Sequence, residues 1–330
     1  MVAKRINYWD NLKCFLIILV VVGHFIEPLV PDSPDAKKVW LWIYSFHMPL
    51  FIFIAGYFHR NVKIIPKMYM YFALGFLSKF LLFVPRLFWS ENPEFSLLSE
   101  SGLPWFMFAM GLFIGVSYLL RNLDARLVLG MSILIAFFAG YDKSVKDYFV
   151  LSRFLVFFPF YYSGVLLQPI NIPERLSKIR WSKLIGIFVL GGVLFLFISN
   201  ISDFYHFRPY FTGRNPYGWH RDIGIIFRMV AYFISFVMCI ALLAACPRKN
   251  LGFFTVVGSR SLQIYFWHRF FISIAVHYGI LSLAATSIGK LIYGLLAVAF
   301  AIFLSLRPWQ FPVVQIKNMC LNKKETLHKY

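Results

Sequence analysis

The stretch from Trp9 to Glu27, WDNLKCFLIILVVVGHFIE, decides the fold class of this chain. Ten uncharged and mostly apolar residues separate Lys13 from His24. The apolar run covers approximately 12–30, close to the roughly 20 residues that a helix needs to cross a bilayer. Because no small-x-small cleavage site follows Phe25, the run predicts a retained membrane-spanning helix and not a signal peptide.

The rest of the 330 residues repeats this pattern. Hydrophobic residues make up 60% of the chain and charged residues 14%, which excludes a soluble domain with a single core. We therefore predict an all-α, polytopic bundle of about ten transmembrane helices, forming one membrane domain over 1–330. The last span is expected to end near residue 306, before a short basic tail, 307–330. The apolar runs lie approximately at 12–30, 39–59, 68–89, 105–120, 127–141, 149–168, 183–201, 223–246, 259–281 and 287–306.

Basic residues outnumber acidic residues by 33 to 14, but they form short clusters between the apolar runs. Such clusters are typical of topology signals and not of a nucleic-acid surface. With the spans alternating, 18 basic residues fall on one side and seven on the other. This asymmetry predicts that both termini face the cytoplasm, in a multi-pass protein of the cytoplasmic (inner) membrane. The four cysteines lack paired spacing, so neither a metal site nor a disulfide framework is expected.

Charged residues at bilayer depth are the next indication of a functional site. Asp10 and Glu27 are the acidic residues at comparable depth, against eight basic residues within the apolar runs or at their edges. A charge at this depth is costly unless it is paired or hydrated. Arg153 and Arg228 lie deep in their runs and are candidates for contacting an anionic ligand or lining a pore. The eight are Lys13, Lys79, Arg86, Arg153, Arg228, Arg260, Arg269 and Lys290, of which Arg86, Arg260 and Lys290 can extend from helix ends to the surface.

The first run predicts a functional strip along one helix. Eleven residues are three turns plus about 20°, so Lys13 and His24 share a face and lie about 16 Å apart. Asp10 lies one turn before Lys13, and Glu27 one turn after His24, close enough to pair. A carboxylate beside an imidazole orients its tautomer and stabilises its protonated form, as a general base requires. Gly23 leaves space beside the histidine for a substrate or a neighbouring helix.

Four segments carry a resemblance to a known family. They are Asp10-Asn11-Leu12-Lys13 with Gly23-His24, the run Phe46-His47-Met48-Pro49-Leu50-Phe51-Ile52-Phe53-Ile54-Ala55-Gly56-Tyr57, the segment Leu103-Pro104-Trp105-Phe106, and 258–268, GSRSLQIYFWH. Together they resemble the acyltransferase-3 family of bacterial membrane acyltransferases, whose first helix carries Arg or Lys, ten residues and then His. The segments are especially similar to the branch described as fucose 4-O-acetylase-like, with Ala55 in place of its usual serine.

The resemblance implies an O-acyltransferase. Its donor would be acyl-CoA, usually acetyl-CoA, which is a substrate and not a permanently bound cofactor. Its acceptor would be a hydroxyl of an envelope saccharide such as O-antigen, capsule or exopolysaccharide. Family members often carry R-x-x-R after the second span for the donor, and here the pattern is Arg60 and Lys63, which keeps the charge but loses one guanidinium fork. Lys13 would meet the donor or stabilise an oxyanion, while His24 would act as a general base or carry the acyl group.

Four further residues are expected on the acceptor side. His47 precedes Pro49, which frees backbone groups and can kink the span, and His268 ends the late signature. Trp105 belongs to the third similar segment, and Trp219 to an aromatic outer segment, 202–222, suited to stacking on sugar rings. The two histidines are also explained by helix packing, and the aromatic residues of the outer segment by an interfacial aromatic belt.

Two rival functions use the same features. Buried cations and broken helices also suit a secondary transporter or flippase for an anionic or sugar-linked lipid, although no clear internal repeat relates the two halves. An enzyme of the same family acting on a lipid, a peptide or a small molecule is the other alternative. The sequence does not choose between these acceptors, and it leaves the oligomeric state open.

Overall fold

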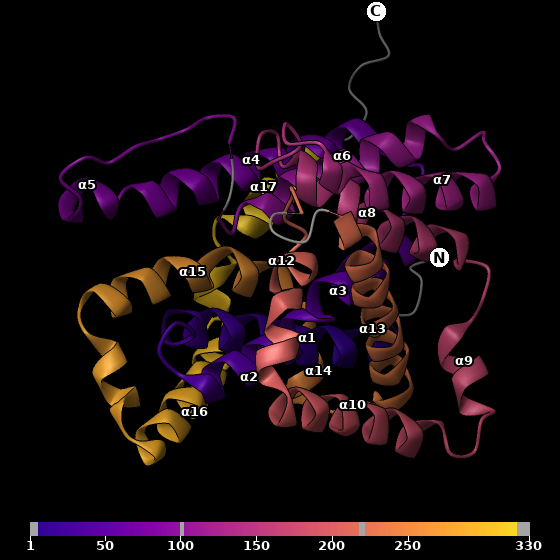
Figure 1. The fold of residues 1–330 in the computed structure, drawn as a ribbon. Helices are drawn as coiled ribbons and strands as arrows, with labels where there is room; N and C mark the ends of the chain where they lie inside the picture. The colour runs from indigo at the N-terminus through magenta and orange to yellow at the C-terminus, as the bar shows by residue number, and fades with distance from the viewer. Residues whose placement is uncertain (1–5, 100–101, 218–221, 322–330) are drawn as a thin grey trace, which may run out of the picture.

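The computed structural model describes residues 6–99, 102–217 and 222–321. Within these residues the secondary structure is helical apart from one isolated β-bridge between Ser99 and Tyr148. Helix α1 (Asn7–Ile26) lies at the centre of the bundle in Figure 1. Pro28 lacks the N–H that would continue the α-helical ladder, and the chain passes into a 3₁₀ turn, Glu27–Leu29, which places Glu27 at the end of α1.

Five helices surround α1. They are α2 (Pro34–Tyr44), α3 (His47–Tyr57), α14 (Phe253–Ser259), α15 (Ser261–His277) and α16 (Ser287–Phe303), and each contacts α1 directly. The apolar side chains of α1 divide between two clusters of the core. Ile17 and Phe25 belong to one cluster, whereas Leu12 and Leu16 belong to the other. The first helix therefore joins both halves of the core.

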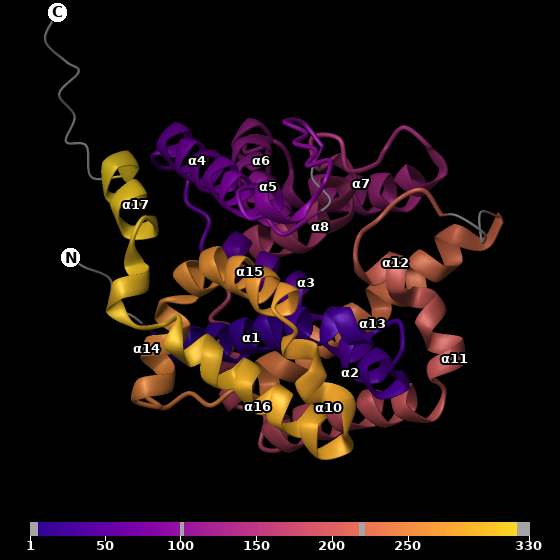
Figure 2. The same cartoon turned by 90° about the vertical axis from the view of Figure 1, so that its left-hand side faces the viewer.

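The remaining helices form layers on either side of this centre. Helix α4 (Ile64–Phe83) packs on α6 (Trp105–Leu119), and α7 (Ala125–Phe138) packs on α8 (Leu151–Leu166). Figures 1 and 2 show these four helices on one side of α1, with α10 (Ser182–Ser199) on the other. Helix α10 packs on α13 (Gly224–Ala245). Short helices, α5 (Arg86–Trp89), α9 (Ile172–Ser177), α11 (Ile201–Phe204) and α12 (Arg208–Phe211), lie in the connections.

The second predicted span, 39–59, corresponds to the apolar segment Pro34–Tyr57, which is long enough to cross a membrane but is not one unbroken helix. The chain breaks at Ser45 and Phe46, between α2 and α3. Pro49 is the third residue of α3, where its missing N–H interrupts no helical hydrogen bond, so the expected kink lies a few residues before the proline. The hydroxyl of Ser235 donates to the Ser45 carbonyl at 2.6 Å and satisfies one of the backbone groups at the break.

Five described helical segments are long and apolar enough to cross a membrane, and four shorter apolar helices accompany them. The predicted number of ten spans is therefore not confirmed. The predicted run 259–281 is also not one helix to its end, because α15 ends at His277 and a 3₁₀ segment, Ile280–Ala285, follows. The five segments are Asn7–Leu29, Pro34–Tyr57, Ile64–Trp89, Ser182–Ser199 and Gly224–Ala245.

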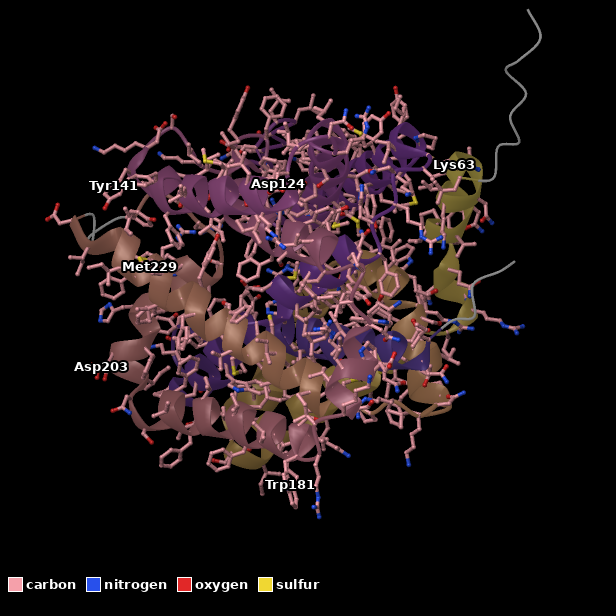
Figure 3. All side chains as sticks on the ribbon, turned by 90° about the vertical axis from the view of Figure 1, so that its right-hand side faces the viewer. Lys63, Asp124, Tyr141, Trp181, Asp203 and Met229 are labelled. Atoms are coloured by element: carbon pink, nitrogen blue, oxygen red, sulfur yellow. The ribbon has the colours of Figure 1, made fainter. Side chains whose placement is uncertain are left out.

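Large apolar side chains cover the outer surface of several helices. Figure 3 shows Met229 of α13 and Trp181, before α10, on this surface, and both are at least half exposed. Phe188 of α10 and Phe233 of α13 are more exposed still. A water-soluble protein rarely exposes so much contiguous apolar surface, whereas a bilayer solvates it. The exterior therefore agrees with a membrane protein.

The segment predicted as a plain tail, 307–330, begins with ordered structure. A 3₁₀ turn, Arg307–Gln310, leads into α17 (Val313–Leu321), which packs against α4. The Lys63 ammonium donates to the Leu321 carbonyl at 2.6 Å, and Figure 3 shows Lys63 beside this helix. The described part of the C-terminal segment is thus part of the helical assembly.

Glycines allow α3 and α8 to touch backbone to backbone. A Cβ atom added to Gly56 would lie 1.8 Å from the Tyr161 carbonyl oxygen, and one added to Gly164 would lie 2.2 Å from the Phe53 oxygen. Both distances are far below van der Waals contact, so no larger residue fits without separating the helices. Small residues that let backbones approach are a common means of helix packing in membranes.

This contact predicts a specific loss of stability. Gly56→Ala should destabilise the protein by about 3 kcal/mol or more, because backbone atoms of α8 cannot move aside as a flexible side chain can. The matched control is Gly192→Ala in α10, where an added Cβ meets nothing within 4 Å. Thermal unfolding in detergent, followed by tryptophan fluorescence, compares the variants. Equal melting temperatures for the two would show that α3 and α8 are not in close contact.

Candidate active site

A cavity of about 600 Å³ lies at the end of α1 that carries His24. Its walls come from helices that are distant in sequence, because α2, α3, α6, α8, α12 and α15 all contribute. The lining combines ionisable groups with aromatic rings. The described residues that line it are His24, Glu27, Trp40, Tyr44, His47, Met48, Arg86, Gly102, Leu103, Trp105, Arg153, Phe157, Arg208, Pro209, Phe211, Thr212, Arg214, Tyr265 and Arg269.

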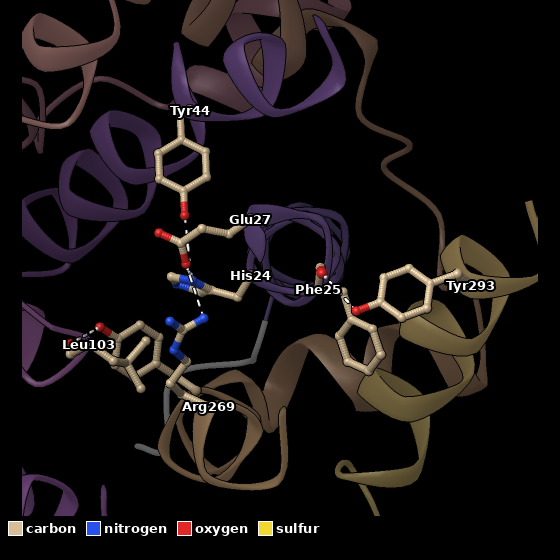
Figure 4. Close-up of polar contacts among 8 residues, drawn as sticks. His24, Phe25, Glu27, Tyr44, Leu103, Arg269 and Tyr293 are labelled. Carbon is tan, nitrogen blue, oxygen red and sulfur yellow. Dashed lines mark hydrogen bonds and ion pairs between the residues drawn. The ribbon is translucent and has the colours of Figure 1, made fainter. Parts of the chain in front are cut away.

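A chain of polar contacts runs through His24, as Figure 4 shows. The imidazole Nδ1 lies 3.0 Å from Glu27 Oε2, and this same carboxylate oxygen accepts a hydrogen bond from Arg269 Nη1, also at 3.0 Å. The Tyr44 hydroxyl lies 3.4 Å from His24 Nδ1. The pairing of His24 with Glu27, predicted from their spacing, is confirmed. Arg269 is the additional member, and it holds the carboxylate from a helix 242 residues away in sequence.

The contact with Glu27 favours the imidazole tautomer that His24 would need to act as a base. A neutral imidazole that donates from Nδ1 to a carboxylate carries its lone pair on Nε2. The carboxylate also stabilises the positive charge that the ring acquires when Nε2 takes a proton. Arg269 pairs with Glu27 at 3.0 Å and holds its carboxylate in place. The three groups thus give His24 the arrangement of a general base or a nucleophile.

Gly23 makes room for the tyrosine beside this histidine. A Cβ atom added to Gly23 would lie 3.1 Å from Tyr44 Cε2, closer than ordinary contact. The predicted close approach beside His24 is therefore made by a neighbouring helix, α2. The Tyr44 ring in turn stacks on Trp40, with ring centroids 3.7 Å apart.

The two other histidines predicted for the site lie near His24. The His268 ring is completely buried, and its centroid lies 5.3 Å from that of His24. Its Nδ1 is 2.8 Å from the Tyr265 carbonyl, and its Nε2 has no hydrogen-bond partner among the described residues. His47 lines the cavity, with Nδ1 2.7 Å from the Ile43 carbonyl. Both rings can therefore donate from Nδ1 to the backbone and keep an acceptor at Nε2.

The tryptophans and arginines predicted for the site do not all lie at the cavity. Trp105 lines the cavity, and the Arg153 guanidinium lies 5.1 Å from its ring centroid. Arg228 does not line the cavity. It is fully buried behind the wall, where Nη2 donates to Asn215 Oδ1 at 2.7 Å and the guanidinium lies 5.2 Å from the Tyr217 ring. Trp219, the other predicted aromatic, lies outside the described residues.

A second cavity, of about 450 Å³, contains Lys13. The Lys13 ammonium lies 2.7 Å from Asp10 Oδ1, so the predicted pairing of these residues is confirmed. Met48 and Tyr265 line both cavities, which therefore share part of their walls. The lining of the second cavity is Lys13, Ile17, Met48, Phe51, Ile54, Ala55, Phe58, Tyr71, Phe106, Met110, Ser261, Leu262, Tyr265 and Lys317.

The predicted donor residues Arg60 and Lys63 lie apart from this second cavity. Both are exposed, and the Arg60 carbonyl accepts a hydrogen bond from Lys67 at 2.9 Å. Lys63 lines a separate apolar groove with Asn61 and Met68. The cation that joins Lys13 in its cavity is Lys317 of α17, which the sequence had assigned to the tail.

Sequence reasoning missed several cavity residues. Arg269 stood among the charges placed within the apolar runs, but nothing in the sequence paired it with Glu27. Tyr44 carried no signal beyond its position in an apolar run. Arg208 and Arg214 lie in the outer segment, 202–222, and only the fold brings them into one cavity with His24 and Glu27.

Comparisons with known proteins identify the family of this chain. The family described as an acyltransferase domain, acyltransferase-3, matches residues 6–306. The nodulation protein NolL of Mesorhizobium japonicum is 38% identical over 87 residues, which are 24% of this chain and 22% of that protein. The chain thus aligns with less than a quarter of that relative's length. No solved structure matches the chain.

The matched region contains the whole of α1, both cavities apart from Lys317, and every member of the contact chain from Tyr44 to Arg269. The chain therefore belongs to the acyltransferase-3 family.

Proposed function

We propose that this protein transfers an acyl group, most simply acetyl, from acyl-CoA to a hydroxyl of a cell-envelope saccharide, with His24 as the general base. The observation that carries the proposal is the sequence of contacts from Arg269 through Glu27 to His24 in the wall of a large cavity. Such a histidine has an available nitrogen, a fixed orientation and a partner for its developing charge. The family supports acyl transfer as the reaction class.

The chemistry follows from the state of His24. The lone pair on Nε2 removes the proton of the acceptor hydroxyl as its oxygen attacks the thioester carbonyl carbon. A C–O bond forms, the C–S bond breaks, and the proton held by the imidazole leaves with the CoA thiolate. During this cycle Glu27 stabilises the imidazolium, and Arg269 holds Glu27 in position.

The second cavity supports a route for the donor. Lys13 and Lys317 give this cavity positive charge, and the exposed Lys63 bonds to the end of α17, the helix that carries Lys317. We assign this end of α1 to the cytoplasm, as the distribution of basic residues predicts. A CoA bound there with its phosphates at the surface would direct its thioester toward Met48 and Tyr265, where the two cavities meet. Asp10 holds Lys13 in place at the entrance.

The first prediction concerns His24 itself. His24→Ala should lower acyl transfer by about 100-fold or more, since general base catalysis contributes factors of this order. The measurement is NMR of surface polysaccharide from strains that carry each variant, with loss of the O-acetyl signal expected. His277→Ala is the control, because His277 is an exposed histidine that lines neither cavity. An intact O-acetyl signal in His24→Ala, together with no binding of acyl-CoA by the purified protein, would favour a transporter.

The second prediction tests whether the negative charge of Glu27, and not only its size and hydrogen bonding, contributes to catalysis. Glu27→Gln keeps a hydrogen-bond acceptor near His24 but removes the charge that stabilises the imidazolium, so kcat should fall by about tenfold to 100-fold. Arg269→Gln should lower kcat through the same carboxylate, and Arg269→Lys should restore part of it because a cation remains. Steady-state kinetics in detergent measure these effects. Equal kcat in wild type and Glu27→Gln would remove Glu27 from the mechanism.

The third prediction distinguishes a base from an acyl carrier. A general base leaves no covalent trace, so incubation with radiolabelled acetyl-CoA alone should yield no label on His24 after rapid denaturation. An acyl-histidine would appear as a labelled peptide that contains His24 and is absent from His24→Ala. Detection of this peptide at a rate compatible with turnover would replace the base by a nucleophile and leave the acyltransferase function intact.

A further inference from the structure

The His24 cavity holds far more positive than negative charge. Arg86, Arg153, Arg208, Arg214 and Arg269 line it, and Glu27 is the carboxylate among its described lining residues. Glu27 is already engaged by His24 and Arg269. An uncharged sugar has no need of this environment. Like charges gathered in a cleft with apolar walls repel one another and attract anions.

Arg208 and Arg214 are positioned by buried structure. Arg208 is the first residue of α12, in which Tyr210 and Phe211 are buried, and Arg214 follows this helix. Behind them, the fully buried Arg228 donates to Asn215 Oδ1 at 2.7 Å and to the Arg214 carbonyl at 3.4 Å. This contact explains Arg228, which sequence had suggested as a ligand residue: it fixes the backbone that carries the cavity's cations.

Two further contacts hold the same segment. The Ser152 hydroxyl donates to the Gly213 carbonyl at 2.6 Å and ties the turn to α8. The Arg208 guanidinium lies 5.3 Å from the centroid of Trp40, which itself lines the cavity. A turn fixed at 213 and 215 and an arginine stacked on a buried ring form a preorganised anion site, since little freedom is left to lose on binding.

From these contacts we infer that the acceptor carries an anionic group of the phosphate or carboxylate type, which Arg208 and Arg214 bind while the acceptor hydroxyl reaches His24. Guanidinium forks recognise both oxyanions through paired hydrogen bonds. The anion belongs to the acceptor because the donor's phosphates are assigned to the Lys13 end of α1, about 16 Å away along the helix. The inference rests on the proposed function and adds the substrate class.

Such an anion has two possible sources, the diphosphate of a lipid-linked sugar and a charged sugar within the saccharide. Wild-type protein distinguishes them by inhibition of acyl transfer to envelope acceptor in membrane vesicles. Farnesyl diphosphate is compared with farnesol, and glucuronate with glucose. At least one anion should inhibit about tenfold better than its neutral partner, in competition with acceptor. Inhibition by neither anion would overturn the inference.

The matched variants are Arg208→Gln with Arg214→Gln, the corresponding double lysine variant, and Lys143→Gln. The double glutamine variant should raise the acceptor KM about tenfold or more and leave the donor KM within about twofold, and the double lysine variant should recover part of the loss. Lys143 is exposed and lines neither cavity, so its variant should change neither KM.

The outcomes separate this inference from the proposed function. A rise in the donor KM instead of the acceptor KM would mean that the arginines bind CoA phosphates, which overturns the inference. An unchanged acceptor KM, with His24→Ala inactive, would also overturn it while the acyltransferase function stands. Full transfer by His24→Ala would instead overturn the proposed function.

Discussion

The contact between Glu27 and Arg269 is the interaction on which the site depends. An ionised carboxylate in an apolar bundle is costly unless a cation and hydrogen bonds compensate it, and here an arginine and an imidazole meet the same oxygen at 3.0 Å. The pair joins the end of α1 to α15, and through α15 it brings His268 and Tyr265 beside His24. Removal of either charge would leave the other uncompensated in the cavity wall.

Local features of this arrangement were predictable from the sequence. The pairs Lys13 with Asp10 and His24 with Glu27 follow from helical spacing, and both occur at hydrogen-bonding distance. The helical class and the membrane character follow from the composition. Helix lengths were less predictable, since α2 ends at Tyr44 and α15 at His277, both within apolar runs that have no break in the sequence. An apolar run shows where a helix is stable and does not show where packing breaks it.

Features that join distant parts of the chain were not predictable. No periodicity relates Glu27 to Arg269, because this ion pair depends on how α1 packs against α15. Likewise, Lys13 and Lys317 line one cavity only because α17 packs against α4 and α15. The excess of cations over acids within the apolar runs did indicate that unusual electrostatics would occur. Only the fold shows that four of those cations take different roles, with Arg269 in the contact chain, Arg153 against Trp105, Arg228 behind the wall and Lys13 in a separate cavity.

The shared wall of the two cavities has a consequence for the membrane itself. Met48 and Tyr265 each line both spaces, so the barrier between them at this point is formed by side chains and not by a whole helix. Under the topology proposed above, an acyl group could pass by local side-chain rotation while the helices keep their positions. Once the side chains return, they would again separate the two cavities and block the passage of water and ions at this point. The protein could then work on both faces of an energised membrane without dissipating its ion gradient.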